Sequence, residues 1–342
     1  MPANLSNETM HQSTLVCSAN MSWILTMMPA SLLIICVLGI ILNLFVLVVF
    51  CFHKKACTVP EIYLSNLAAA DLLLMWCLPF EAVSTANEYI WPFGNAMCKL
   101  LSVFFSMNSC CSSGFLVLVS IDRYLALVHP LSHERLRRPI CAKLGCLLVW
   151  TLGLLLSVHN IIYKKTVQNP TNNATGCAVD ESVITTFMLC DVMVTIFNFF
   201  IPLCVMCFCT VKIVKVLRNR VIERSNAQKM EHKATTLVLA VLLVFLICWL
   251  PFHMTKMLIV FLFSFPLNNC PVYITMEISR LLCIFLAFLN SVLNPLLYVI
   301  VGKTFHKKAK AFFRQCINVT MTTSLCSGKL LIRCSKCCEQ ML

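Results

Sequence analysis

The sequence predicts an all-α membrane protein, in which a bundle of seven transmembrane helices is followed by a short amphipathic helix. Three observations lead to this fold class: 59% of the residues are hydrophobic, only 12% are charged, and long apolar runs recur along the 342-residue chain. A helix that crosses the hydrocarbon core of a bilayer needs about 20 apolar residues. Such a composition excludes a soluble globular domain.

Seven runs meet that requirement. Six contain no Asp, Glu, Lys or Arg, and the second carries charge only at Glu61 and Asp71. In chain order, the predicted spans are Trp23–Phe50, Val59–Phe80, Leu100–Ile121, Leu144–Tyr163, Val192–Val211, Ala234–Thr255 and Leu281–Gly302. They predict three regions: a tail at residues 1–22, the bundle at 23–302, and a cytoplasmic segment at 303–342.

Lysine and arginine set the expected orientation, because positively charged loops stay in the cytoplasm. Most of the 27 basic residues lie in the loops after odd-numbered spans or in the carboxyl-terminal segment. The five exceptions are Lys99, Lys164, Lys165, Lys256 and Arg280. We therefore expect a multi-pass protein of the plasma membrane with its amino terminus outside the cell.

Glycosylation signals agree with this orientation. Asn4, Asn7 and Asn20 begin N-X-Ser/Thr sequons in the amino-terminal tail, and Asn173 begins another in the second outer loop. No apolar core precedes Trp23, so the first span is expected to direct insertion itself. The net charge of +13 sits in short clusters beside the spans, which favours contact with anionic membrane lipid over nucleic acid.

Most of the 23 cysteines lie within the spans, where a thiol behaves as a small apolar side chain. Four fall in the oxidising exterior: Cys17, Cys98, Cys177 and Cys270. Four cysteines allow three pairings, and spacing alone does not choose among them.

Asp71 is a carboxylate near the middle of the second span, where it is costly unless it is paired or hydrogen-bonded. Polar residues on neighbouring spans could gather around it: Asn43, Asn108, Ser112, Asn290, Ser291 and Asn294. Two interpretations stay open, a site for a cation and a water-filled polar network.

The sixth span contains Pro251, which removes a backbone donor and is expected to bend the helix there. Phe245 and Trp249 lie four residues apart and hence on one helix face. Such a pair is either a moving part of the bent helix or ordinary packing.

Asp122, Arg123 and Tyr124 close the third apolar run, so charges lie where a span should leave the bilayer. Arg123 has two candidate partners, its neighbour Asp122 and Glu231 at the base of the sixth span. An ion pair at the solvent edge contributes about 0–1 kcal/mol, so it biases an equilibrium without locking it. The alternative is that these charges only anchor helix ends.

After Gly302, residues Lys303–Arg314 alternate basic and apolar side chains, which predicts an amphipathic helix on the inner leaflet. Cys316 and Cys326 follow it and are predicted palmitoylation sites. The Cys334–Cys337 spacing resembles a zinc motif, but no compact fold surrounds it to preorganise the metal.

Motifs on the predicted spans resemble the rhodopsin-like G-protein-coupled receptors. They are Asn43, Leu67–Asp71, Asp122–Tyr124, Trp150, Pro202, Cys248–Pro251 and Asn294–Tyr298, with Pro295 inside the last. Longer strings, including Glu61–Asp71, Ser120–Val128, Ile247–Phe252 and Tyr298–Lys303, resemble the kinin (bradykinin) receptors, nearer the type-2 subtype.

The resemblance implies disulfides Cys98–Cys177 and Cys17–Cys270, and an allosteric sodium ion at Asp71, Asn108, Ser112, Asn290 and Ser291. It implies no other cofactor. It also implies that Asp122, Arg123, Tyr124, Glu231, Phe245, Trp249, Pro251, Asn294, Pro295 and Tyr298 switch the bundle and couple it to a heterotrimeric G protein of the Gq class. Receptor kinases and arrestin are expected partners at the hydroxyl-rich tail.

The expected ligand is a basic extracellular peptide of kinin type. Its predicted pocket holds Glu81, Phe105, Ser106, Asp191, Trp249, Phe252 and Glu277, with Asp180 and Glu181 at the mouth. Ser106 replaces a type-1 Lys, so a peptide retaining its C-terminal Arg should be preferred. Glu81 stands where kinin receptors have Trp and Ile259 where they have an acidic residue, which leaves another basic vasoactive or chemotactic peptide as the alternative.

Other function classes fit less well. The chain shows no phosphate-binding glycine loop and no nucleophile–base motif, so it is not expected to be an enzyme. A transporter or channel tends to need charges along its path and often has internal repeats, whereas Asp71 is the only strong charge well inside a span. A scavenging receptor that does not signal is disfavoured by the intact Asp122–Tyr124 sequence.

Overall fold

A computed structural model describes residues 22–51, 57–129, 138–168, 174–219, 226–263, 270–301 and 303–322. The elements of the bundle are α2 (Ser22–Cys51), α3 (Val59–Met75), α4 (Leu78–Ala86), α5 (Gly94–Val128), α6 (Pro139–Tyr163), α7 (Ile184–Thr195), η2 (Ile196–Phe200), α8 (Ile201–Asn219), α9 (Asn226–Phe263) and α10 (Cys270–Val301). A final helix, α11, spans Lys303–Thr322.

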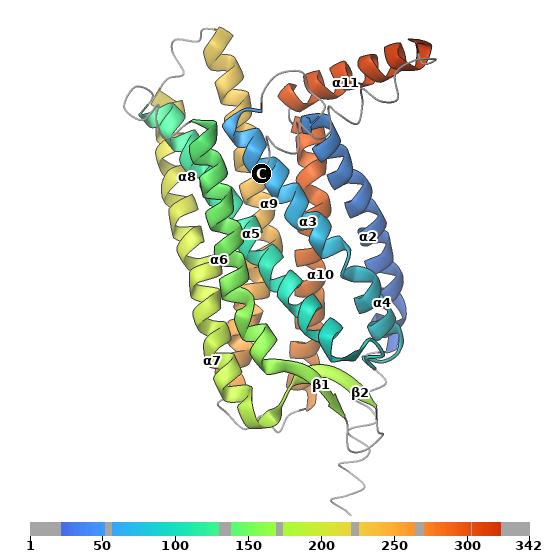
Figure 1. The fold of residues 1–342 in the computed structure, drawn as a ribbon. Helices are drawn as coiled ribbons and strands as arrows, with labels where there is room; N and C mark the ends of the chain where they lie inside the picture. The colour runs from blue at the N-terminus through green and yellow to red at the C-terminus, as the bar shows by residue number, and fades with distance from the viewer. Residues whose placement is uncertain are drawn as a thin grey trace, which may run out of the picture.

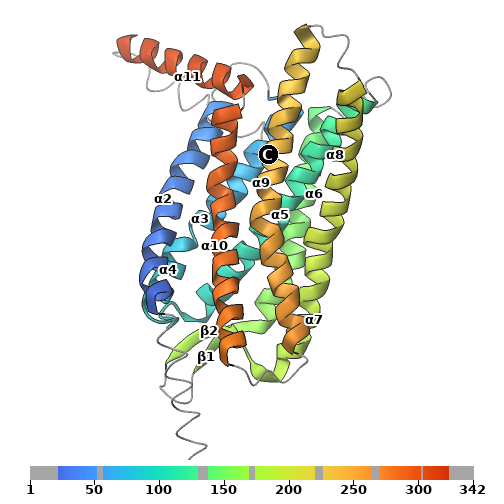
Figure 2. The same cartoon turned by 180° about the vertical axis from the view of Figure 1, so that it is seen from behind.

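Within these residues, seven helical segments are long and apolar enough to cross a bilayer. Figure 1 shows them side by side, with a β-hairpin across one end and α11 crosswise at the other. Figure 2 shows the same arrangement from behind. We call these the hairpin end and the α11 end. The predicted fold class is confirmed.

The helices extend past the predicted spans. α5 begins at Gly94 rather than Leu100, and α9 begins at Asn226 rather than Ala234. Charges end an apolar run without ending the helix, because a helix can continue into water beyond the membrane. The final helix α11 also runs past Arg314, the predicted end of the amphipathic segment, to Thr322.

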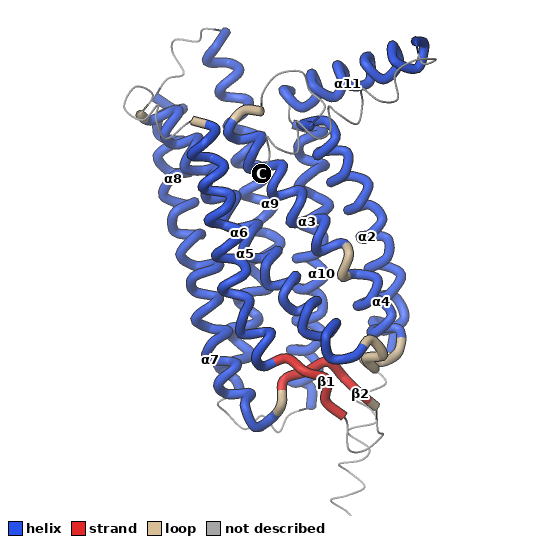
Figure 3. The backbone as a smooth tube through the Cα atoms, viewed as in Figure 1, coloured by secondary structure: helices blue, strands red, loops and turns tan. Residues whose placement is uncertain are grey.

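Two spans are interrupted, as the tube in Figure 3 shows for the second. The chain turns at Trp76 and Cys77 between α3 and α4, and Pro79 lies in the first turn of α4, where its missing N–H is harmless. In the fifth span, α7 passes through the π-helical turn η2 into α8, and Asn198 of this turn bonds Ser109 and Ser113 of α5. By contrast, α9 is one helix through Pro251.

A two-stranded hairpin covers one end of the bundle, and the sequence did not reveal it. β1 (Lys164–Gln168) pairs antiparallel with β2 (Thr175–Val179). The disulfide Cys98–Cys177 ties β2 to α5, which confirms that predicted pair. Trp91 secures the same corner, since its backbone N–H donates to the Thr175 carbonyl at 2.7 Å.

At the other end, a buried ion pair fastens α11 to the bundle. The Lys308 ammonium lies 2.7 Å from Glu61 of α3, and both side chains are less than a tenth exposed. The other Glu61 oxygen accepts the backbone N–H of Thr58 at 2.8 Å. Phe305 packs edge-on against Phe50 beside this pair. Lys308 therefore faces the bundle rather than the lipid surface expected for the basic side of this helix.

Breaking this pair should destabilise the protein, because one charge would stay buried without its partner. We expect Lys308→Met to cost about 3–5 kcal/mol, and Glu61→Gln a similar amount although it keeps an acceptor for Thr58. The measurement is thermal unfolding of the purified protein. The matched control is Lys307→Met at an exposed neighbour, and equal melting of the Lys307 and Lys308 variants would contradict the anchor.

Candidate functional site

A cavity of about 360 Å³ opens toward the hairpin end of the bundle. Five of the predicted ligand contacts line it, namely Glu81, Phe105, Ser106, Asp191 and Phe252. Trp249, in contrast, is fully buried behind the cavity, with its ring centroid 6.3 Å from that of Phe105 and 5.8 Å from that of Phe252. Trp249 is therefore a support for the pocket wall rather than part of its lining.

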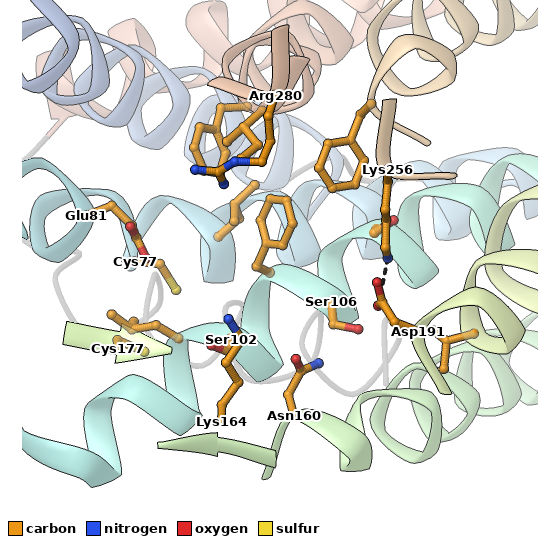
Figure 4. A pocket seen from close by; sticks show the side chains of 18 of the residues that line it. Cys77, Glu81, Ser102, Ser106, Asn160, Lys164, Cys177, Asp191, Lys256 and Arg280 are labelled. Atoms are coloured by element: carbon orange, nitrogen blue, oxygen red, sulfur yellow. Dashed lines mark ion pairs between the residues drawn. The ribbon is translucent and has the colours of Figure 1, made fainter. Parts of the chain in front are cut away.

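Glu81 reaches the cavity because of the interrupted second span. The turn at Trp76 and Cys77 starts a new helix, and Glu81 lies in the first turn of α4. Figure 4 shows its carboxylate directed into the pocket beside Cys77.

Asp191 lines the pocket, and its carboxylate is paired with side chains from two other spans. The Lys256 ammonium of α9 lies 2.7 Å from Asp191 Oδ1, and His159 Nε2 of α6 lies 3.5 Å from the same oxygen. These partners come from other spans and are remote in sequence, so no local pattern revealed them. Asp191 thus links α6, α7 and α9 around the pocket, and its charge is already balanced.

The acidic residues near the hairpin are held by local contacts. The Lys165 ammonium lies 2.5 Å from Asp180, which also accepts the backbone N–H of Ser182 at 3.0 Å. These hydrogen bonds lower the pKa of the Asp180 carboxyl to about 2. Asp180 is held in a local cap, and Glu181 is an exposed residue of a short 3-10 turn, so both are parts of the loop.

Cations make up more of the pocket than the sequence indicated. Lys164, Lys256 and Arg280 line it together with Glu81 and Asp191. Burial, followed by the nearby Arg280 charge, lowers the pKa of the Lys164 ammonium. In the sequence these three cations are exceptions to the charge asymmetry of the loops, and a sequence gives no indication of which loop residues point inward.

An aromatic cluster lies between the pocket and the middle of the bundle. The rings of Phe245 and Trp249 are 6.3 Å apart, as their spacing predicted. His253, which lines the pocket, stacks on Phe199 with ring centroids 4.2 Å apart and on Trp249 at 5.8 Å. A ligand that moves the pocket wall would therefore press on this cluster.

Asp71 is fully buried and bonded to two other helices. Its carboxylate accepts bonds from Ser291 at 2.7 Å, Asn108 at 3.0 Å and Asn294 at 3.3 Å. Asn43 is connected to this network indirectly, because its side-chain amide donates to the backbone carbonyl of Ser291 at 2.9 Å. The predicted gathering is confirmed for these residues.

Several oxygens and nitrogens near this network are buried without a hydrogen-bond partner among the described residues. They are the Ser112 hydroxyl, both amide atoms of Asn290, and the amide oxygens of Asn43, Asn108 and Asn294. Buried polar groups normally have hydrogen-bond partners, so these atoms are available to bind a water molecule or a cation.

Arg123 lies near the α11 end and pairs with Asp122. Its Nε and Nη2 lie 3.0 and 2.5 Å from Asp122 Oδ2, while the side chain of the other candidate, Glu231, lies outside the described residues. Tyr124 bonds His129 at 3.1 Å. Tyr298 is almost fully buried in the central core.

Some predicted residues lie outside what the structure describes. The structure does not describe the side chains of four of them, Glu231, Glu277, Cys270 and Cys316, although their backbones lie in helices. The remaining positions are Cys17, Cys326 and the sequon residues Asn4, Asn7, Asn20 and Asn173.

The pair of Asp191 and Lys256 should contribute to the stability of the bundle without any ligand. Asp191→Asn and Lys256→Met should each lower the unfolding free energy, because each leaves its partner partly buried and uncompensated. The double variant should lose less than the sum, with a coupling of roughly 0.5–3 kcal/mol. Chemical unfolding of the purified protein measures this cycle, and additive losses would show that the two side chains do not interact.

The sequence matches a known family over most of the bundle. The description of that family is "7 transmembrane receptor (rhodopsin family)", and the match covers residues 42–298. The matched region includes Asp71, Arg123 and Trp249, whose surroundings are described above.

Similar curated proteins narrow the relationship. The B2 bradykinin receptor of Oryctolagus cuniculus is 42% identical over 294 residues, covering 85% of this chain and 80% of the relative. The B2 bradykinin receptor of Homo sapiens is 41% identical over 291 residues, covering 84% and 74%. The B1 bradykinin receptor of Homo sapiens is 34% identical over 292 residues, covering 84% and 82%. The chain therefore belongs to the rhodopsin family of seven-transmembrane receptors and, within it, to the bradykinin receptors, with the type-2 receptors more similar than the type-1 receptor.

Proposed function

We propose that this protein is a plasma-membrane receptor for a bradykinin-like peptide and signals through a Gq-class G protein to phospholipase C and calcium release. The observation that carries the proposal is the cavity at the hairpin end, where Glu81 and aromatic side chains line one pocket. The hairpin end and the amino terminus then face outward, and the α11 end faces the cytoplasm.

The chemistry of the pocket suits a peptide with a basic residue. A guanidinium or ammonium of the ligand would meet Glu81, while Phe105 and Phe252 would pack against its apolar parts. Opposite charges attract more strongly in a partly desolvated cavity than in water. The proteins most similar here are named for bradykinin, and Ser106 supports a peptide that keeps its C-terminal Arg. Another basic vasoactive or chemotactic peptide is the second candidate, because Glu81 departs from the kinin pattern.

Signalling requires that the pocket and the cytoplasmic end share one conformational equilibrium. The aromatic cluster of Trp249, Phe245 and His253 lies on α9, the helix whose other end carries Glu231. Asn294, Pro295 and Tyr298 occupy the corresponding part of α10. A ligand that favours one position of these helices would change the access of the G protein to Arg123. Receptor kinases and arrestin would act at the same cytoplasmic side.

We also propose an allosteric sodium ion at the Asp71 network. The residues present fit such an ion, because the Asp71 carboxylate and the buried oxygens of Asn108, Ser112 and Asn290 are the hard oxygen ligands that such cations prefer. Several of these oxygens have no hydrogen-bond partner among the described residues. Together with Ser291, they would hold the ion and favour the inactive arrangement.

Other parts of the proposal concern the chain termini and loops. The bond Cys17–Cys270 would brace the amino-terminal tail at the pocket mouth. Glycans at Asn4, Asn7, Asn20 and Asn173 would mark the outer face, and palmitate at Cys316 and Cys326 would hold the tail to the inner leaflet.

The direct test of function is a calcium-flux screen in cells that express the protein. Bradykinin, its des-Arg form, and other vasoactive and chemotactic peptides are applied, while ionic current is recorded. We expect bradykinin to release calcium without a current, and a Gq inhibitor to abolish the response. A peptide-dependent current in place of calcium release would favour the channel alternative.

Arg123 should be needed for signalling but not for ligand binding, because it lies at the end of α5 opposite the pocket. Arg123→Ala should bind bradykinin with unchanged affinity and release no calcium. Glu231→Ala should raise basal activity by freeing α9. The matched control is Arg138→Ala, an exposed residue at the start of α6. Normal calcium release from Arg123→Ala together with a silent Glu231→Ala would refute this switch.

Sodium should weaken agonist binding, because the ion would stabilise the inactive state. Replacing choline with sodium at constant ionic strength should lower bradykinin affinity about 5- to 150-fold, the usual range of allosteric coupling. Asp71→Asn should remove the difference. Radioligand competition measures both, and an Asp71→Asn receptor as sensitive to sodium as the unmodified receptor would exclude this site.

A further inference from the structure

We propose that Tyr89 is a ligand-contact residue of the pocket, whose ring receives a basic side chain of the peptide. This inference rests on the proposed function as a peptide receptor and adds a residue that no sequence motif indicated. The backbone of the turn that follows α4 leads to it.

One face of α4 lines the pocket. Cys77, Glu81 and Ser84 follow one another at intervals of four and three residues, and all three line the cavity. The helix ends at Ala86, and the chain then turns back, so that the backbone N–H of Tyr89 donates to the Ser84 carbonyl at 2.7 Å. Tyr89 therefore stays next to this face, and it lines the same cavity.

This turn has an unusual backbone. Among the described residues other than Gly, only Glu88 and Tyr89 have a positive φ, 52° and 64°. Glu88 follows the helix end, where one left-handed residue is common, and its N–H donates to the Thr85 carbonyl at 3.2 Å as this type of helix ending requires. The helix ending thus accounts for Glu88 but not for Tyr89, because it needs only one left-handed residue.

A bulky residue in the left-handed region is strained, and it keeps that conformation only where its surroundings hold it. Backbone hydrogen bonds on the far side of Tyr89 do so here. The Ile90 N–H donates to the Asn87 carbonyl at 2.9 Å, and the Trp91 N–H donates to the Thr175 carbonyl of β2 at 2.7 Å. Strain of this kind is concentrated at functional sites. The turn therefore fixes Tyr89 in the wall of the pocket.

The surroundings of Tyr89 indicate which part of a peptide it contacts. The residue is 38% exposed, so part of its side chain is accessible to a ligand. The face of an aromatic ring attracts a cation within about 6 Å of its centre, most strongly where water is partly excluded. Glu81 lines the same cavity and attracts a cation as well. A guanidinium or ammonium drawn in by Glu81 would therefore also pack on the Tyr89 ring.

The experiment measures the affinity of receptor variants for bradykinin by radioligand competition. Tyr89→Leu keeps an apolar side chain but removes the aromatic face. It should lower the affinity about 3- to 30-fold, as expected for one cation–π contact. Tyr89→Phe keeps the ring and should bind nearly as well as the unmodified receptor.

Peptide analogues identify the group that Tyr89 contacts. Each Arg of the peptide is replaced in turn by citrulline, which keeps the shape of the side chain and loses its positive charge. The loss caused by Tyr89→Leu should nearly disappear for the analogue that lacks the bound cation, and it should persist for the others. A purely structural effect of the substitution would be the same for every analogue.

The matched control is Ile90→Ala, which truncates the exposed neighbour outside the described pocket lining and should leave the affinity unchanged. Normal affinity of Tyr89→Leu, or an equal loss for the peptide and all its citrulline analogues, would overturn this role of Tyr89 while the receptor assignment stands. An unmodified receptor that does not bind bradykinin would instead refute the kinin assignment. The peptide that the calcium screen identifies, with its own citrulline analogues, would then test Tyr89.

Discussion

The buried carboxylate of Asp71 is the interaction on which the arrangement of the bundle depends. Its hydrogen bonds join α3 to α5 through Asn108 and to α10 through Ser291 and Asn294, and Asn43 adds α2. A charge in the middle of a membrane protein is tolerated only when such partners are present. The helices must therefore keep positions in which these donors converge, and any ligand-driven shift has to rearrange them.

The pocket and the α11 end are each built around charges that the fold neutralises. Asp191 binds Lys256 and His159 at one end, while Glu61 binds Lys308 and Asp122 binds Arg123 at the other. Lys164 in the pocket differs from these residues, because no carboxylate among the described residues lies within ion-pair distance of its ammonium.

The sequence predicted the fold and the central motifs because these depend on local patterns. Apolar runs gave the spans, and the spacing of Phe245 and Trp249 placed them on one face of α9. The Cys98–Cys177 pair came from the resemblance to a family, which the structure supports.

The remaining errors concern contacts between distant segments. Asp191 has no basic neighbour in the sequence, and its partners Lys256 and His159 come from other spans. Lys308 was expected at the lipid surface, but its partner Glu61 lies on α3. The strands β1 and β2 were not predicted, because short polar segments carry little periodicity.

We expect a peptide in the pocket at the hairpin end to change the arrangement of the α11 end through the shared helices. Spin labels on unnatural amino acids at the α11 ends of α5 and α9 would report their separation in the purified receptor. Bradykinin should shift the measured distances toward longer values. A distance distribution that stays unchanged while bradykinin is bound would contradict it.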